Sequence, residues 1–283
     1  MNKRKTIIRF GNGYDYLEQL LDSNETFSLS STNQTMNFKY KDYSIVYTKD
    51  AITKNEMFLQ KRIKKVIKDN VVVSKLPKSR PRIDYFNFSN SLEYMTHARG
   101  EIVEINNLAE MDITKAYYYT AYNLGLIDKE FFEKCFNLRK DIRLRLIGSI
   151  ATSKIERTFK DGEQTGFKVV EDRDLRKAWF YICSIVDKCL RRCSKAIGND
   201  FLFYWVDGIY YKTRNPIPSH DFNSKVLKKI FKQFNYDYKI VDCQRLLLKN
   251  EGNNITINVH KEGKIKLFTI PTSNVKKYAV INE

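Results

Sequence analysis

The segment Arg173–Ile197 constrains the fold of this chain more than any other, because it carries a long and regular pattern of apolar residues. They recur at spacings of three and four, the period of a helix with one buried face: Leu175, Ala178, Trp179, Ile182, Ile185, Val186, Cys189, Leu190, Cys193 and Ile197. Gly198–Asn199 then ends the helix. Two apolar, aromatic runs follow at 201–206 and 209–213, and Asp207–Gly208 between them predicts the turn of a β-hairpin. A long helix that leads directly into a hairpin is therefore expected.

The other periodic segments predict an α/β (α+β) chain with an antiparallel sheet backed by helices. Strands are expected at 6–10, 43–48, 101–113, 238–248 and 255–270, and further helices at 54–68, 114–126, 129–153 and 222–234. The segment 75–82 is rich in Pro and cationic residues, which indicates an exposed connector. We therefore expect a small basic N-terminal region at 1–82 and a larger C-terminal domain at 83–283.

The charge balance favours a polyanionic partner. Lys and Arg number 50 against 33 Asp and Glu, a formal net charge of +17, and cations placed on phosphates release condensed counterions. Hydrophobic residues make up 42% of the 283 residues, enough for a packed core, so wholesale disorder is not expected. The many Tyr and Phe residues either stack on unpaired bases or simply build the core.

The cysteines and the N-terminal segment set further limits. The five cysteines show no zinc-finger spacing and are expected to be small core residues, with a metal pair at Cys189 and Cys193 as the alternative. Residues 1–9 are basic but lead into no long apolar run, and no segment approaches membrane-spanning length. The sequence thus predicts a cytoplasmic protein without a membrane partner.

Two carboxylates lie at positions where the backbone is expected to be rigid while the side chain stays accessible to solvent and ligand. Asp112 and Asp207 each end an apolar, strand-like run. On adjacent strands, such a pair can bind two Mg²⁺ (or Mn²⁺) ions for an in-line displacement at phosphorus. Taken alone, an Asp before Gly is explained by the turn, whose conformation Asp favours. The catalytic interpretation therefore depends on the two residues together.

These two segments resemble motifs of the palm domain of family B DNA polymerases, especially the protein-primed kind. MDITKAYYYT (111–120) is similar to the first motif, an Asp, two residues and Ser-Leu-Tyr-Pro, and FYWVDGIYYK (203–212) to the third, Tyr-x-Asp-Thr-Asp-Ser. The resemblance implies a palm-type sheet in which Asp112 and Asp207 are the catalytic, metal-binding residues. It also implies that Tyr117 screens out a ribose 2′-hydroxyl, while the backbone of Thr114, Lys115, Ala116 and Tyr117 binds the incoming triphosphate. Trp205 replaces the first Asp of the third motif.

Further segments resemble the same family in the same order. HARGEIVE (97–104) is similar to an Arg-Gly-Gly-Arg element that touches the template, which implies that role for Arg99 and Gly100. NVKKYAVI (274–281) is similar to a Lys-x-Tyr element that holds the primer end, which implies that role for Lys276, Lys277 and Tyr278.

The fingers region implied by the resemblance is short, at about 128–157. Of its middle motif only Ser149 clearly matches. Arg139, Lys140 and Arg143 are the favoured cations for clamping the triphosphate, and the alternative is that they form the polar face of an ordinary amphipathic helix.

The resemblance implies template-directed nucleotidyl transfer by a reduced DNA polymerase of a phage or mobile element. Its partners would be a DNA primer–template or single-stranded DNA, dNTPs or NTPs, and a replication or priming protein that replaces the missing thumb. No proofreading exonuclease is expected, because residues 1–80 lack its Asp-x-Glu strand. Two alternatives stay open: a primase that makes short primers de novo, and a catalytically inactive palm that serves as a nucleic-acid-binding or assembly module.

Overall fold

The chain folds into two compact units, each with its own sheet. The computed structural model describes residues 5–272 apart from 24, 33–34, 41, 49–52, 90–101 and 262. The first unit combines residues 1–79 with 124–179, and the second combines 80–123 with 180–283. The boundary at residue 79 falls within the predicted connector 75–82.

The sheet of the first unit has six strands in the order β1-β4-β3-β2-β7-β8, and β1 and β4 are the one parallel pair in it. Its strands are β1 (Lys5–Phe10), β2 (Phe27–Ser31), β3 (Thr35–Lys39), β4 (Tyr43–Thr48), β7 (Lys154–Lys160) and β8 (Glu163–Val170). Because β2 pairs with β7, the segment 128–157 belongs with the N-terminal region, and not with the domain at 83–283 as the sequence predicted. Long-range pairing of this kind leaves no local pattern in a sequence.

The hairpin β7–β8 was not predicted, although its turn carries a clear signal. Asp161 and Gly162 form the two-residue loop between the paired residues Lys160 and Glu163, with φ of 52° and 77°. Asp-Gly suits such a turn because both positions need a positive φ.

The helices of the first unit are α1 (Tyr14–Asp22), α2 (Lys54–Lys68), α3 (Val71–Lys75), α6 (Lys129–Phe136) and α7 (Lys140–Gly148), and α7 continues into a 3-10 turn at Ser149–Ala151. Helix α2 has its predicted bounds and begins where the side chain of Thr53 accepts a hydrogen bond from the N–H of Glu56. The single helix predicted at 129–153 is instead divided into α6 and α7. The guanidinium of Arg143 donates to the carbonyls of Phe136 and Leu138 at the break, and so satisfies backbone groups that a continuous helix would have paired.

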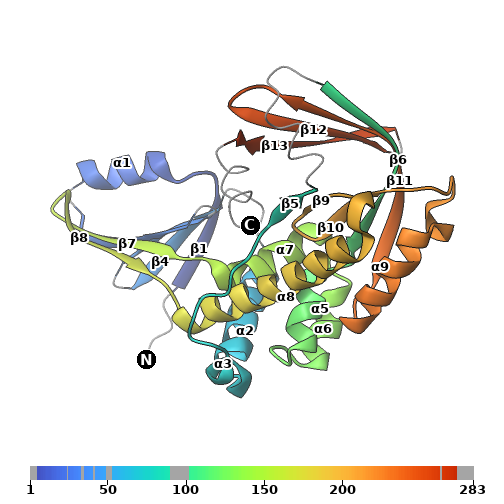
Figure 1. The fold of residues 1–283 in the computed structure, drawn as a ribbon. Coiled ribbons are helices and arrows are strands. Elements are labelled where there is room, and N and C mark those ends of the chain that lie inside the picture. Colours follow the sequence, from blue (N-terminus) through green and yellow to red (C-terminus); the bar gives the residue numbers. More distant parts are fainter. Residues whose placement is uncertain are drawn as a thin grey trace. The chain divides into compact units, whose positions relative to one another are not determined.

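The second unit contains an antiparallel sheet of seven strands in the order β13-β12-β11-β6-β10-β9-β5 (Figure 1). Its strands are β5 (Phe86–Phe88), β6 (Ile102–Ile113), β9 (Phe201–Trp205), β10 (Gly208–Lys212), β11 (Tyr238–Asn250), β12 (Asn254–Lys261) and β13 (Lys264–Pro271). Its helices are α5 (Ala116–Asn123), α8 (Arg173–Ile197) and α9 (Phe222–Gln233), where the first residues of α8, up to Trp179, lie in the first unit. The predicted combination of antiparallel strands and helices is confirmed.

The two faces of this sheet carry different cores. On β6, Ala109, Met111 and Ile113 enter one core together with residues of α8 and α9. Leu108 enters the other, which is built from β9 to β13 without a helix. Since side chains alternate along a strand, Asp112 lies on the face of the sheet away from α8 and α9. Helices thus stabilise one face and leave the other for the site.

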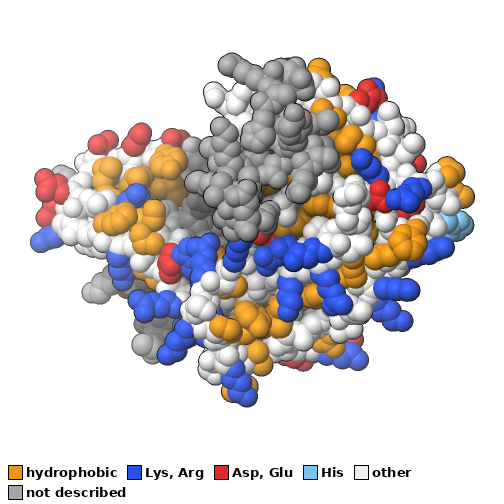
Figure 2. Space-filling view, in the orientation of Figure 1, with side chains coloured by type: hydrophobic (Ala, Val, Ile, Leu, Met, Phe, Trp, Pro, Cys, Tyr) orange, Lys and Arg blue, Asp and Glu red, His pale blue; other side chains and the backbone are white. Residues whose placement is uncertain are grey.

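Two surface properties follow from the described residues. Lys and Arg side chains gather over α8 (Figure 2), where Lys188, Arg192 and Lys195 are exposed. None of the helices in the described part of the chain combines the length and the apolar character that a membrane span needs.

Candidate active site

The sheet brings the two predicted catalytic residues to neighbouring positions. Gly208 of β10 pairs with Asp112 of β6, and the N–H of Ile113 donates to the carbonyl of Asp207 at 3.0 Å. Both carboxylate-bearing residues are partly exposed. The backbone therefore holds Asp207, in the loop directly before β10, next to Asp112 on β6 at one end of the ladder.

The hairpin tip differs by one residue from the predicted turn. Trp205 pairs with Gly208, so the loop residues are Val206 and Asp207, and Gly208 is the first residue of β10. Val206 has a φ of 59°, a conformation that costs a β-branched residue of the order of 1–3 kcal/mol. Its N–H donates to the carbonyl of Tyr85 at 2.7 Å, which helps to hold the loop in this conformation. Strained backbone next to Asp207 is a feature that functional sites often share.

At Gly208, the first residue of β10, the site leaves little space for a side chain. A Cβ on residue 208 would lie 3.1 Å from Oδ1 of Asp112 and 3.5 Å from Oε1 of Glu110. The two carboxylates thus converge over the same glycine.

Glu110 is a site residue that the sequence reasoning missed. It lies two residues before Asp112 on the same face of β6 and is only 2% exposed. Tyr210 donates to its Oε1 at 2.5 Å, Lys266 donates to the same oxygen at 3.0 Å, and Lys261 forms an ion pair with Oε2. An acidic residue within an apolar run, at strand spacing from Asp112, was the signal available in the sequence.

The partners of Glu110 keep it ionised. Burial alone would raise the pKa of this carboxyl, but the hydrogen bonds from Lys261 and Tyr210 and the charge of Lys266 outweigh burial, so the pKa is lowered from its usual value. Glu110 is therefore a permanent negative charge beside Asp112, compensated by two ammonium groups.

The start of α5 is anchored to the loop before β11. The N–H of Thr114 donates to the carbonyl of Asp237 at 2.8 Å, so it is engaged within the sheet rather than directed at a triphosphate as predicted. The hydroxyl of Tyr119 donates to Oδ2 of the same Asp237 at 2.6 Å. Lys115 turns the chain into the helix with a φ of 54°, and Ala116 is buried in the core beneath α8 and α9.

Tyr117 lies within electrostatic reach of Asp207. Burial, followed by the charges of Cys183 and Asp207, raises the pKa of the Tyr117 hydroxyl well above its usual value. The phenol is therefore neutral at any ordinary pH. Its side chain is only partly buried.

Trp205 is explained by packing. Its ring centroid lies 5.6 Å from that of Phe86 and 5.3 Å from that of Phe268, within the core on the helix-free face. At the position where the motif it resembles has an Asp, this chain has an aromatic contact between three strands.

The donor chemistry of the site suits Mg²⁺. Asp112 and Asp207 offer carboxylate oxygens, and Mg²⁺ commonly binds to one or two carboxylates while the phosphates of its substrate and water complete the shell. Glu110 is committed to its two lysines. Across the described residues, no group of three or more His, Cys, Asp or Glu side chains could hold a metal ion. A metal at this site would therefore depend on its substrate for further ligands.

The predicted triphosphate-binding cations lie in the first unit and differ in their contacts. Arg139 forms an ion pair with Asp141 at 2.8 Å, and Arg143 donates to two backbone carbonyls at the end of α6. Lys140 is exposed at the start of α7. Arg145 is a structural residue, since it forms an ion pair at 2.6 Å with Glu56, which is 2% exposed.

The predicted template and primer residues Arg99, Gly100, Lys276, Lys277 and Tyr278 lie outside the described residues. The chain matches no protein-family model. A search of curated proteins finds no match either.

Proposed function

We propose that this chain transfers nucleotides to the end of a nucleic-acid strand as directed by a template, in the manner of a DNA polymerase palm. The observation that carries this proposal is the pairing of Gly208 with Asp112, which puts Asp207, the loop residue before Gly208, next to Asp112 of the adjacent strand. Tyr117, at the start of the next helix, adds support because the charge of Asp207 acts on its hydroxyl. All three residues fall on the motifs that carry the family resemblance.

Asp112 and Asp207 would hold Mg²⁺ together with the phosphates of an incoming nucleotide. When bound, Mg²⁺ neutralises developing charge on the phosphates and lowers the pKa of the attacking 3′-hydroxyl. The rigid strand positions of the two carboxylates supply the orientation that makes such a reaction effectively intramolecular.

Other groups of the second unit have supporting roles in this proposal. Tyr117 would exclude a ribose 2′-hydroxyl by its bulk, the role that the resemblance implies, and so favour deoxynucleotides. Glu110 is a positioning residue, because its carboxylate lies beside that of Asp112 and is fixed by Tyr210, Lys261 and Lys266. Strained backbone at Val206 fixes the hairpin tip that presents Asp207.

A second candidate is an inactive palm that binds single strands or assembles with other proteins. One observation favours it: Arg139 and Arg143, two of the three predicted triphosphate-binding cations, are engaged by groups of the chain itself. With these two guanidinium groups engaged, fewer cations could hold an incoming triphosphate, which catalysis needs and strand binding does not.

Extension of a labelled primer–template tests the proposal. The assay compares dNTPs with NTPs in Mg²⁺ or Mn²⁺, includes a lane without primer, and uses wild type, Asp112→Asn and Asp207→Asn. Asp242→Asn is the matched control, since Asp242 is an exposed carboxylate on β11. Extension that either site variant abolishes and the control retains supports the two-metal polymerase.

The other outcomes are equally decisive. Products in the lane without primer would favour a primase. No product in any lane, from a folded protein that still binds single strands, would overturn the catalytic proposal and favour the binding module.

A further inference from the structure

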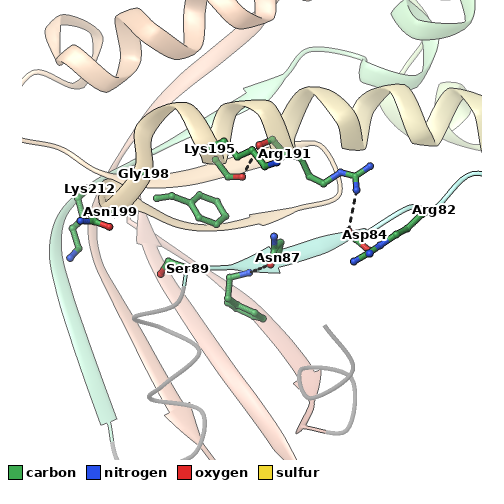
Figure 3. A pocket seen from close by; sticks show the side chains of 12 residues that line it. Arg82, Asp84, Asn87, Ser89, Arg191, Lys195, Gly198, Asn199 and Lys212 are labelled. Carbon is green, nitrogen blue, oxygen red and sulfur yellow. Dashed lines mark hydrogen bonds and ion pairs between the residues drawn. The ribbon is translucent and has the colours of Figure 1, made fainter. Parts of the chain in front are cut away.

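The second unit contains a pocket whose lining shares only Lys212 with the motifs above. Its volume is about 620 Å³, within the range of small-ligand sites. It lies between the C-terminal half of α8 and the segment that runs through β5, and Lys212 at the end of β10 closes one side (Figure 3).

The pocket is strongly cationic. Four cationic side chains line it: Arg82 before β5, Arg191 and Lys195 one helical turn apart on α8, and Lys212 on β10. Asp84 is the one carboxylate among the lining residues. Like charges drawn together from three separate segments repel one another, and an anion relieves that cost.

Asp84 holds two of these cations in place. Its carboxylate, 6% exposed, lies 3.3 Å from Nε of Arg82 and 3.6 Å from NH1 of Arg191. Arg191 also forms an ion pair at 2.9 Å with Asp187 one turn earlier. A guanidinium fixed in this way is preorganised for a phosphate, which its planar donors match.

Lys195 and Lys212 are available for a ligand. In the described part of the chain, no ion pair involves either ammonium group. Asn87, Ser89 and Asn199 add neutral hydrogen-bonding groups around them. The lining thus combines fixed guanidinium groups, ammonium groups outside any described ion pair, and neutral polar groups.

The aromatic residues of the pocket point to recognition of phosphate rather than of bases. Phe88 and Phe201 are 8% and 5% exposed and belong to the two cores of the sheet, so neither offers a free face for stacking. Phosphate contacts position a strand without reading its sequence.

We infer that this pocket binds the phosphodiester backbone of a single nucleic-acid strand, without base preference. The inference rests on the proposed function in one respect, the choice of nucleic acid as the source of the phosphate. The pocket is separate from the catalytic pair. Lys212 pairs with Leu108, four residues along the ladder from Gly208 and Asp112, a distance of about 13 Å.

Binding of a short labelled oligothymidylate in EDTA, followed by fluorescence anisotropy over a series of salt concentrations, tests the inference. The site variant is Lys195→Ala combined with Lys212→Ala. The matched control is Lys188→Ala combined with Arg192→Ala, which removes the same charge from exposed positions of α8 outside the pocket. Thermal unfolding of both variants verifies that they fold.

We expect the site variant to bind about 25-fold more weakly at about 0.1 M salt, with a salt slope reduced by about 1.4, because each phosphate contact on a single strand contributes about 0.7 to that slope. The control should change affinity by about twofold or less, through the general field alone. An oligodeoxyadenylate should give the same result, since the pocket offers no stacking surface.

Three results would overturn the inference: no binding by wild type, equal losses in both variants, or displacement of the strand by dTMP or inorganic phosphate at equal concentration. The last would identify a site for free phosphates. Because binding is measured without metal, it is independent of primer extension. If primer extension depends on Asp112 but strand binding does not depend on Lys195 and Lys212, only the inference about the pocket is overturned. If strand binding depends on these lysines but no primer is extended, only the catalytic proposal is overturned.

Discussion

Asp112 and Gly208 face each other across β6 and β10 so closely that a side chain at residue 208 would displace the carboxylate of Asp112. A Cβ at this position would lie 3.1 Å from Oδ1 of Asp112, closer than nearly all real contacts of this kind. The φ of Gly208 is not among the positive values found in the chain. Close approach, and not turn formation, is therefore what requires glycine here.

Gly208→Ala should reduce primer extension while the fold persists. The added methyl group displaces the carboxylate of Asp112 by a few tenths of an ångström, and because a shift of about 1 Å in a reacting group costs about a hundredfold, we expect a loss of about tenfold or less. Extension rates and circular dichroism measure the two effects. Gly148→Ala is the control, because a Cβ there meets nothing within 4 Å. This variant should be more stable than wild type by about 0.5–1 kcal/mol, since Ala favours a helix more than Gly does. Equal extension rates for Gly208→Ala and Gly148→Ala would contradict the proposal that the close approach of residue 208 to Asp112 matters for activity.

Glu110→Gln should destabilise the protein by about 1.5–3 kcal/mol at pH 7, because the hydrogen bonds of two lysines and Tyr210 to the buried carboxylate lose its charge. The effect depends on pH. The folded-state pKa of Glu110 is lowered, so its contribution is present above the unfolded pKa and is lost as pH falls through the folded pKa. The difference between wild type and variant should therefore shrink in acid.

Urea unfolding at a series of pH values measures this difference. Glu104→Gln is the matched control, since Glu104 is exposed on the same strand. A Glu110→Gln variant as stable as this control would show that the ion pairs of Glu110 with the two lysines do not stabilise the fold.

Tyr117→Val should lower the preference for dNTPs over NTPs about tenfold or more, whereas Tyr117→Phe should keep it, because bulk and not the hydroxyl is proposed to exclude the 2′-hydroxyl. The raised pKa of Tyr117 keeps the phenol neutral, so the wild-type preference should be constant with pH up to the usual range of tyrosine. Single-nucleotide incorporation with each triphosphate measures the ratio. Loss of preference in the Phe variant would assign the discrimination to the hydroxyl.

Arg145→Ala should destabilise the protein by about 3–5 kcal/mol, because it leaves the carboxylate of Glu56 buried without its partner. Arg139→Ala should leave stability nearly unchanged, since its ion pair with Asp141 is exposed and screened by solvent. Denaturant unfolding of the two variants separates the structural arginine from the exposed one. A small effect at Arg145 would contradict the buried ion pair.

The sequence by itself determined the elements that local periodicity specifies. Helices α2 and α8 have the predicted bounds, and a strand ends at Asp112 as expected, because apolar spacing along a chain reports directly on the face that will be buried. Asp112 and Asp207 could be chosen from the ends of such runs. The turn at Asp161 and Gly162 was equally visible and could have been predicted.

Only the tertiary structure decided how distant segments meet. The pairing of β2 with β7 assigns residues 128–157 to the N-terminal unit, and Lys261 of β12 and Lys266 of β13 reach Glu110 of β6 across the sheet. The hairpin loop lies at Val206 and Asp207 because Trp205 pairs with Gly208, which makes Gly208 part of the strand. Such contacts depend on register between strands far apart in sequence, and no local pattern of residues encodes that register.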